Sequence, residues 1–236
     1  MQNTIKEILD DIDYHANPYF KSLNDGSFEK DDFVETQIQF FGAVIFFSRP
    51  MAAVAAKIPG AQRRIEVIRN VWEEHGEGHD RLMHGTTFEQ LLFLLGVSDR
   101  EALESRALWP EVRQFNTLLT GACVMDEFLV GVGVMGMIEY MFSDISGMIG
   151  RGIVERGWIA DDKLVHYNLH EKLDVKHSQD FFDVVAPNWD AGGDDRYIIE
   201  QGLWLGAHCF NNLYLGLYNA RKRRLFRTAR CPHART

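Results

Sequence analysis

Apolar residues recur at three- and four-residue spacing along most of the chain, as they do on one face of an α-helix. The spacing predicts a first helix over about residues 4–23, kinked at Pro18, and a second over about residues 29–48. The second helix carries aromatic and aliphatic residues nearly all round its axis, which predicts a central, buried position. Arg49-Pro50 is expected to interrupt it.

The same spacing continues toward the C-terminus. It predicts helices over residues 51–58, 61–75, a segment ending at Gly96, a short segment after Ser98, 110–149, 161–186 and 194–225. Ser98 and Glu101 have the spacing of a capping box, and Pro187 is expected to end the helix that starts at Asp161. Only six prolines occur, and neither a tandem repeat nor a long linker divides the chain. The sequence therefore predicts an all-α protein with a single domain.

Composition limits the class of protein further. The chain has 236 residues, 46% of them hydrophobic, which is enough to bury a sizeable core. No apolar run reaches the roughly 18 residues that a membrane span needs, and the N-terminus lacks the layout of a signal peptide. The cysteines (Cys123, Cys209 and Cys231) are odd in number and widely spaced, so we expect no disulfide framework. These features predict a soluble protein of the reducing cytoplasm.

The formal net charge of −9 is unevenly distributed. Residues 221–236 hold seven Lys and Arg and no acid, so the rest of the chain has 18 basic against 34 acidic residues, a net charge of −16. An acidic body argues against nucleic-acid binding. We expect a helical domain over residues 1–225 and a basic, disordered tail over 226–236. The expected partner is a small-molecule substrate, with neither nucleic acid nor membrane, and the sequence leaves a homodimer open.

Three residues of the predicted helix over 161–186 suggest a metal site. His170, Asp174 and His177 fall within about 60° of one another on the helix face. The two imidazoles are roughly 10 Å apart along the axis, too far to share one ion as neighbours. With the aspartate between them, each can hold one ion of a pair. Imidazole and carboxylate together suit iron, manganese or zinc rather than calcium.

A second cluster of acids and histidines surrounds a Gly-x-Gly break that follows His75. In an unbroken helix Glu74 and His84 would lie about 15 Å apart. Glycine can take backbone conformations that interrupt a helix and let the chain fold back, so the break allows these two side chains to meet. His75 and His79 have the spacing of a zinc-protease pair, but their glutamate is misplaced and the glycines spoil the helix. We therefore do not expect either to be a ligand.

Glu139 stands alone in an otherwise apolar helix. A buried ionised carboxylate is costly unless it is paired, hydrogen-bonded or bound to a metal ion, so Glu139 is the third element of the candidate site. The glycines of the run Gly131–Gly136 fit a dinucleotide-loop pattern, but no strand precedes them. We expect Gly133 and Gly136 instead to let another helix, or a small ligand, approach near Glu139.

Together these motifs resemble the heme-oxygenase-like diiron oxidases and oxygenases, iron-containing redox enzymes on the thiaminase II-like helical scaffold. The resemblance covers roughly residues 30–220 in order and spacing. It implies a helical bundle of about seven core helices and a cytoplasmic enzyme that uses two Fe(II)/Fe(III) ions and O2 as co-substrate. The ligands that it implies, which are also the catalytic residues, are Glu74, His84, Glu139, His170, Asp174 and His177. A seventh carboxylate ligand, found in some members, has no counterpart around residues 46–49.

Reactions in that family include N-oxygenation, desaturation with C–C cleavage, decarboxylation and nitrile formation, and the ligands alone do not choose among them. Other classes of protein stay open. A metal-independent enzyme similar to thiaminase II or to quinone-cofactor synthases would give a role to Cys123 or Cys209 instead, and a non-catalytic binding protein would need none of these residues. Ferritin-type diiron bundles use Glu-x-x-His twice, and this chain contains no such motif.

Arg49 is the candidate for binding substrate. It directly follows a run of aromatic residues in the second predicted helix, which we expect to line the pocket. An apolar pocket with one cation suits a molecule with an aliphatic body and a carboxylate, such as an amino acid or a fatty acid. Arg49 could hold that carboxylate through two hydrogen bonds, although pairing with a structural acid is the competing explanation.

Overall fold

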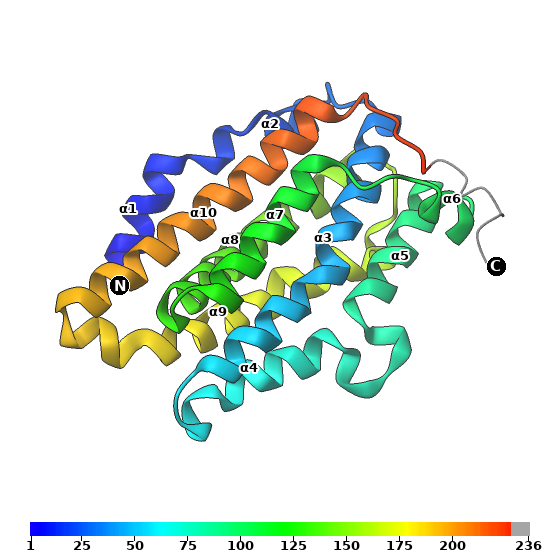
Figure 1. Cartoon of the computed structure of the whole chain (residues 1–236). Coiled ribbons are helices and arrows are strands. Elements are labelled where there is room, and N and C mark those ends of the chain that lie inside the picture. Colours follow the sequence, from blue (N-terminus) through cyan, green and yellow to red (C-terminus); the bar gives the residue numbers. More distant parts are fainter. Residues whose placement is uncertain (228–236) are drawn as a thin grey trace, which may run out of the picture.

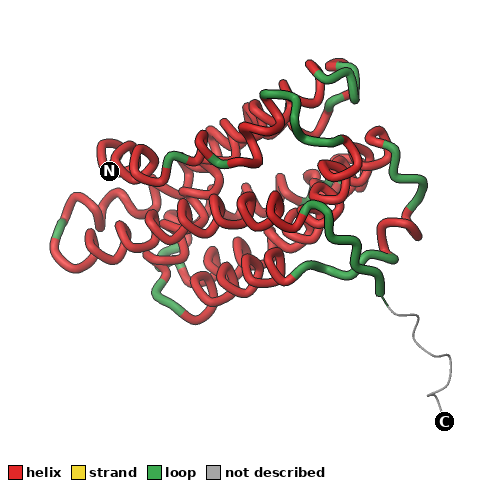
Figure 2. Tube along the Cα trace, turned by 90° about the horizontal axis from the view of Figure 1, so that it is seen from above, coloured by secondary structure: helices red, strands yellow, loops and turns green. Residues whose placement is uncertain are grey.

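The computed structural model describes residues 1–227 (Figure 1). This part of the chain forms helices joined by turns and loops, and it contains one isolated β-bridge but no longer strand. Its α-helices are α1 (Gln2–Ile12), α2 (Pro18–Asn24), α3 (Lys30–Lys57), α4 (Ala61–Glu74), α5 (His84–Leu95), α6 (Arg100–Glu104), α7 (Pro110–Thr120), α8 (Phe128–Glu155), α9 (Val165–Ala191) and α10 (Gly193–Ala220). They form one bundle, and Figure 2 shows the loops gathered at the ends of the helices. The prediction of an all-α, single-domain chain is confirmed.

The bundle is built around α8, which is buried along most of its length. Helices α9 and α10 pack along α8, and α3 packs against α4, α5 and α7. Helices α1 and α2 lie on the outside of α10, as the blue and orange ribbons in Figure 1 show. Because α4, α5, α8 and α9 meet in this arrangement, residues far apart in the sequence come together in the interior.

Glycines set how closely α8 approaches its neighbours. A Cβ atom on Gly202 of α10 would lie 2.5 Å from the carbonyl oxygen of Val130, and one on Gly133 would lie 3.2 Å from the Cα atom of Gly202. On another face of α8, a Cβ atom on Gly136 would lie 2.9 Å from the Phe182 ring of α9. The expectation that Gly133 and Gly136 let other helices approach is confirmed, and both lie within α8 rather than in a dinucleotide loop.

The first predicted helix is two helices. Asp13 takes a left-handed conformation with φ of 41°, which ends α1. The side chain of Asn17 then accepts a hydrogen bond from the backbone N–H of Tyr19 and caps α2. Pro18 occupies the first turn of α2, where a missing N–H costs nothing, so it starts a helix rather than kinking one.

Two other prolines were expected to end helices, and both expectations are wrong. Helix α3 continues through Pro50, and α9 continues through Pro187. Apolar residues follow each proline on the buried face, Met51 and Trp189 among them. Their burial holds the helix together although a proline removes one backbone hydrogen bond. Helix α3 is also less buried than predicted, since Ile45 is 48% exposed.

Three further boundaries differ from the predictions. The expected helix over residues 110–149 divides at a π-helical turn, Gly121–Met125, and α8 then runs on through Gly150 and Gly152 to Glu155. The short helix α6 is capped by the side chain of Asp99, which accepts a hydrogen bond from Ala102 N, rather than by Ser98. A residue with a short acidic side chain is as good a cap as serine, and the sequence offers both in succession.

The C-terminal end of the described chain runs beside the segment before α7. Phe226 forms the isolated bridge with Arg106, and the backbone N–H of Ala107 donates to the carbonyl oxygen of Leu225. The expected tail over 226–236 therefore begins with two placed residues, and residues 228–236, including Cys231, lie outside the described part of the chain.

Helices α3 and α8 are long and apolar enough to cross a membrane by length and composition. In the bundle, 67% of the apolar window of α8 and 44% of that of α3 is buried against other helices. Core helices of soluble proteins can have the same length and composition, so the two helices are only weak evidence of a membrane span.

Candidate metal centre

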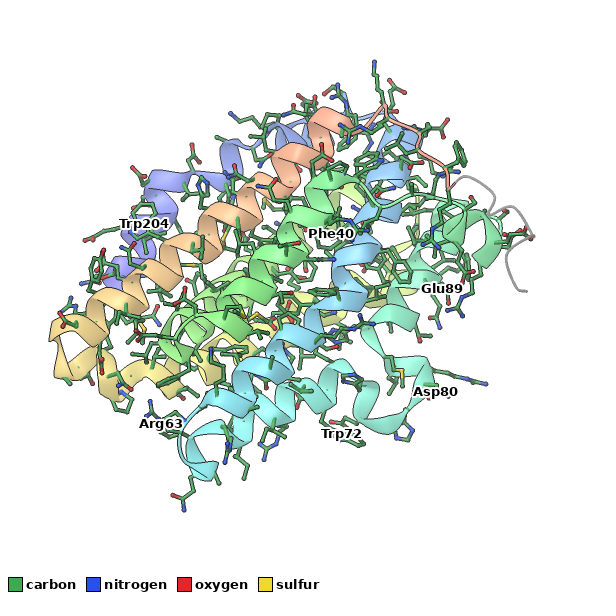
Figure 3. All side chains as sticks on the ribbon, viewed as in Figure 1. Phe40, Arg63, Trp72, Asp80, Glu89 and Trp204 are labelled. Carbon is green, nitrogen blue, oxygen red and sulfur yellow. The ribbon has the colours of Figure 1, made fainter. Side chains whose placement is uncertain are left out.

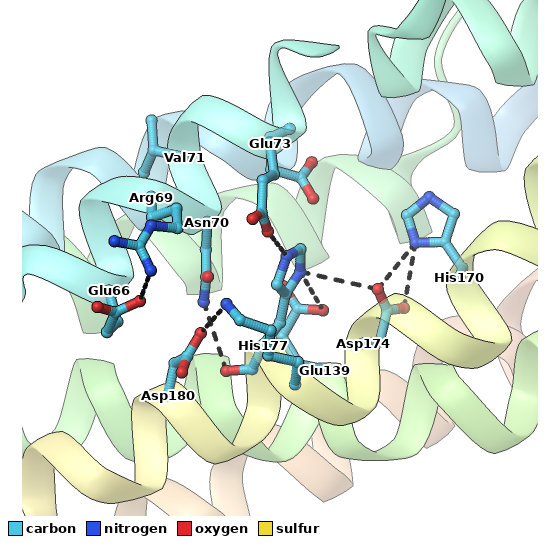
Figure 4. Close-up of polar contacts among 12 residues, drawn as sticks. Glu66, Arg69, Asn70, Val71, Glu73, Glu139, His170, Asp174, His177 and Asp180 are labelled. Carbon is cyan, nitrogen blue, oxygen red and sulfur yellow. Dashed lines mark hydrogen bonds and ion pairs between the residues drawn. The ribbon is translucent and has the colours of Figure 1, made fainter. Parts of the chain in front are cut away.

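Four helices bring the six predicted ligands together in the interior. Glu74 ends α4, His84 begins α5, Glu139 lies in the middle of α8, and α9 supplies the remaining three. All six side chains are buried: Glu74, His84, Glu139, His170, Asp174 and His177. Figure 4 shows Glu139 of α8 beside His177 and Asp174 of α9, below Glu73 of α4.

The tightest grouping joins three of these helices. One ligand atom from each of Glu74, Glu139 and His177 lies within 4.8 Å of the others. Asp174 Oδ1 is 3.8 Å from His177 Nδ1 on one side and 3.0 Å from His170 Nδ1 on the other (Figure 4). The aspartate therefore stands between the two histidines of α9, as the spacing of the motif predicts.

The break between α4 and α5 brings Glu74 and His84 into contact. His84 Nδ1 is 2.7 Å from Glu74 Oε1, although ten residues separate them in the sequence. Gly76 makes the fold-back possible, because its φ is 62° and a Cβ atom there would lie 2.6 Å from the backbone of Leu82. Burial tends to raise the pKa of Glu74, but the neighbouring His84 and its hydrogen bond bring that pKa below the usual value.

His75 and His79 are exposed and lie outside the cluster. His75 Nδ1 is 2.7 Å from the carbonyl oxygen of Val71 in its own helix. Trp72 and Asp80 mark this side of the molecule in Figure 3, and both are also exposed. The placement agrees with the expectation that neither histidine is a ligand.

Glu73 belongs to the site and was missed in the sequence. Its Oε2 atom is 2.7 Å from His177 Nε2, as the upper dashed line in Figure 4 shows. His177 therefore donates its Nε2–H to this carboxylate, which leaves Nδ1 unprotonated and facing Asp174 and Glu139. Glu73 is the immediate neighbour of Glu74, and only the contact between α4 and α9 distinguishes their roles.

His166, also missed, lies one turn before His170 on α9. It is buried, and its ring centroid is 4.4 Å from that of His170. Burial, reinforced by His170 and His84, holds the pKa of His166 well below its usual value, so the ring is neutral. The i−4 spacing from His170 is the signal that could have identified it.

The protein atoms leave several donor atoms of the cluster without partners. Among the described residues, His84 Nε2, His170 Nε2, His177 Nδ1 and Glu139 Oε1 are buried and make no hydrogen bond. Burial, with Asp174 and Glu74 nearby, raises the pKa of Glu139 well above its usual value. Buried polar atoms are costly unless something binds them, and imidazole nitrogens with carboxylate oxygens suit iron. The residues present therefore fit a metal centre.

A small cavity of about 40 Å³ borders the cluster. Its walls include Phe40, Phe47, Phe142 and Phe210 beside side chains of the cluster, and no Lys or Arg is among its lining residues. Phe40 of α3, which is labelled in Figure 3, is buried. Of the four aromatic residues expected from α3, Phe40 and Phe47 line this cavity, whereas Phe41 and Phe46 line a separate groove. The phenylalanine side chains make the surroundings of the cluster apolar.

Arg49 lies away from this cavity. It is exposed, sits over the ring of Phe46, and lines a separate groove between α3 and the segment that precedes α7. A position on the outer face of α3 does not favour the anchoring role predicted for it, which stays an untested prediction.

The two cysteines of the described chain are poor candidates for a nucleophile. Cys123 and Cys209 are both buried. Burial raises the pKa of each thiol to about 12, so almost no reactive thiolate forms at neutral pH. These environments disfavour a cysteine-dependent enzyme similar to thiaminase II.

Comparison with known proteins supports the class of enzyme. Residues 34–210 match the sequence profile of a family described as iron-containing redox enzymes. No curated protein matches the chain significantly.

Solved structures match the fold at low sequence identity. A domain of unknown function with a heme oxygenase-like fold from Shewanella denitrificans has a TM-score of 0.72 at 13% identity, over 92% of this chain and 90% of that one. A CADD-like protein of unknown function from Nostoc punctiforme gives 0.74 at 13%, over 92% and 95%. A TenA family transcription regulator from Silicibacter gives 0.64 at 13%, over 93% and 95%. These structures show that the fold is heme oxygenase-like.

Proposed function

Because this chain belongs to the family of iron-containing redox enzymes, we propose that it is a non-heme diiron enzyme that uses O2 to oxidise a small organic substrate. The observation that carries the proposal is the burial of three carboxylates and three imidazoles together in the bundle. Three carboxylates offset most of the charge of two Fe(II) ions, and such a set of donors in an apolar interior has no evident structural use.

The six residues divide between two ions. Glu74, His84 and His170 would hold one, because the Glu74–His84 contact and the packed rings of His84 and His170 lie at one end of the cluster. Glu139 and His177 would hold the other, and one ligand atom of Glu74 lies within 4.8 Å of theirs. Asp174 lies between the two histidines of α9 and would serve as the sixth ligand. Two Fe(II) ions bound there would supply electrons for the reduction of O2.

The remaining residues prepare the site. Glu73 keeps His177 in the tautomer whose Nδ1 atom is free to bind a metal ion. The phenylalanine wall excludes water from the cluster, which strengthens every electrostatic interaction inside it. The cavity has room for a molecule the size of O2, so a larger substrate requires aromatic side chains of the wall to move.

We infer an apolar or aliphatic body for the substrate, as in the amino acids and fatty acids expected from the sequence. The aromatic wall supports the apolar part of such a molecule. The carboxylate was inferred from Arg49, and since Arg49 lines a different groove and no Lys or Arg lines the cavity, the carboxylate is the less supported part of this proposal. N-oxygenation, desaturation with C–C cleavage and decarboxylation all remain within the proposed class of reaction.

Anaerobic titration with Fe(II), followed by measurement of O2 consumption, tests the proposal. We expect about two irons per chain, and substantially less iron in the His170→Ala and Glu139→Ala proteins. The double variant C123S/C209S and the His79→Ala variant should bind iron like the parent chain, since none of these residues lies in the cluster. Full iron content in both ligand variants would refute the assignment, and a parent chain without iron would favour a metal-independent enzyme or a binding protein.

A further inference from the structure

A second pocket reaches the cluster from the surface of the molecule. It has a volume of about 260 Å³ and lies between α3 and the first turns of α5. Ile45 and Arg100, which are exposed, line its outer part, and Glu74 and His84, which are buried, line its inner part. Two of the six proposed ligands therefore form a wall of a pocket that is open to solvent.

The same two ligands and Val44 separate this pocket from the buried cavity. Val44, Glu74 and His84 line both spaces, so the pocket and the cavity meet at these three side chains. Glu74 and His84 hold each other in place, because His84 Nδ1 is 2.7 Å from Glu74 Oε1. Val44 is half-buried, and its side chain has no polar atom, so only packing holds it in its rotamer. Val44 is thus the part of the partition that can move.

Phe47 lies beside Val44 on the cavity side of the partition. The two residues are three positions apart, so they share a face of α3, and Phe47 is also half-buried. Two other phenylalanines of the cavity wall, Phe40 and Phe210, are only 4% and 2% exposed. The cavity has room for a molecule the size of O2, so a larger substrate requires the wall to move. Movement of Val44 and Phe47 joins the cavity to the surface pocket.

Gly85 keeps the pocket open on the side of α5. It follows His84 in the first turn of that helix and lines the pocket. A Cβ atom there would lie 3.1 Å from Cγ2 of Ile45, so a larger side chain would project into the space between α3 and α5. Glycine destabilises a helix relative to alanine, and the φ angle of Gly85 is not positive, so the backbone does not require it. The absence of a side chain at this position leaves space in the pocket.

Two larger hollows of the surface do not reach the cluster. The groove that contains Arg49 has a volume of about 1020 Å³, and the pocket between α1, α8 and α9 has about 680 Å³. Within residues 1–227, none of the six proposed ligands lines either of them. The contact with Glu74 and His84 therefore distinguishes the pocket between α3 and α5, although its volume is smaller.

We propose that the pocket between α3 and α5 is the entrance through which the organic substrate reaches the metal centre, and that Val44 sets the width of the molecules that pass. The proposal rests on the proposed function, since it requires a metal centre in the cluster. Phe41, Ile45 and Met83 give the pocket apolar contacts, which suit the apolar or aliphatic body inferred for the substrate. Val44 is then a specificity-determining residue, because a larger side chain there narrows the route and a smaller one widens it.

Stopped-flow measurement of ligand binding to the iron-loaded, oxidised protein tests the entrance without a measurement of turnover. Azide and phenol both bind Fe(III) with new absorption bands, and phenol is the wider of the two. We expect Val44→Phe to slow the association and the dissociation of azide by the same factor, at least about tenfold, and to leave its dissociation constant unchanged. A residue that contacts the bound ligand would change that constant instead. Val44→Ala should speed the entry of phenol by a larger factor than that of azide.

Val34→Phe is the matched control. Val34 is also a half-buried valine of α3, but it lines neither the pocket nor the cavity, so the same change there should leave both rate constants unaltered. A Val44→Phe protein with full iron content and the rate constants of the parent chain would overturn the proposal. A parent chain that binds no iron would contradict the proposed function instead.

A label attached after folding tests the same route, should Val44→Phe fold poorly. Ser48 lines the pocket and is half-buried. In a chain that also carries Cys231→Ser, Ser48→Cys provides a thiol at this wall for a bulky maleimide. The remaining thiols, Cys123 and Cys209, are buried. We expect the labelled protein to bind azide at least about tenfold more slowly than the same protein without label, and equal rates after complete labelling would overturn the proposal.

Discussion

Glu73 acts on the candidate metal centre through His177. Replacing it with Gln removes the charge that accepts the Nε2–H, so the imidazole of His177 is held less firmly in its binding tautomer. We expect the Glu73→Gln protein to bind its second iron roughly 10- to 100-fold more weakly, as measured by anaerobic competition with a chelator. Glu7→Gln, on the exposed face of α1, is the control and should not change iron binding. Unaltered affinity in Glu73→Gln would show that His177 needs no such partner.

Glu139 makes the stability of the metal-free protein depend on pH. Burial, with Asp174 and Glu74 nearby, raises its folded-state pKa well above the usual value of 4.5 that it has in the unfolded chain. Between those two values the folded state holds a proton that the unfolded state has lost, so the free energy of unfolding falls as pH rises. Glu139→Gln cannot lose a proton, and we expect its free energy of unfolding to fall less steeply between about pH 5 and 8 in urea titrations. Parallel curves for the two proteins would contradict the raised pKa.

The sequence singled out the six side chains that gather in the interior, but neither Glu73 nor His166 beside them. His170, Asp174 and His177 share one helix face, so their spacing alone places them together. Glu73 contacts His177 and His166 contacts Thr87, and in each pair the two residues lie on different helices. Such contacts depend on how α4 and α5 are rotated against α9, and the spacing of residues along one helix contains no information about that rotation.

At the scale of elements, the break between α4 and α5 brings two of the proposed ligands, Glu74 and His84, into contact. Gly76→Ala combines a positive φ with a clash against the backbone near Leu82, so it should displace His84 from Glu74. We expect the variant to lose measurable stability, by about 2 kcal/mol or more in urea unfolding, together with one iron. Gly60→Ala is the matched control: its φ is also positive, at 78°, but nothing lies within 4 Å of the added Cβ.

The control isolates the effect of the clash from that of the backbone conformation. Gly60→Ala should cost only about 1 kcal/mol and keep its iron. Equal stability losses in the two variants, with iron retained in both, would mean that the break does not position His84.

The sequence predicted correctly which segments are helical. It was a poorer guide to where a helix ends at a proline or a glycine. Pro50 and Pro187 lie inside helices because packing on both sides of each outweighs the lost hydrogen bond. Pro18 lies at a helix start because Asn17 provides a cap. The local sequence offers the same residue type in all three places, and only the tertiary contacts decide between a break and a continuation.

At the scale of the whole molecule, the bundle brings together side chains from four segments that are far apart in the sequence. The prediction of a single all-α domain followed from continuous apolar periodicity and few prolines, and it is confirmed. Periodicity did not predict that α4, α5, α8 and α9 pack together. The pattern shows which face of each helix is buried, but not which other helix covers that face. The resemblance to an iron-containing family provided that information, and the arrangement of the bundle agrees with it.

The central claim is that two metal ions bind between α4, α5, α8 and α9. Anomalous X-ray diffraction at the iron edge, on crystals of the Fe(II)-loaded protein, tests it most directly. The account predicts two iron peaks per chain, one beside Glu74, His84 and His170 and one beside Glu139 and His177. A single peak, or peaks at the exposed His75 and His79, would contradict it.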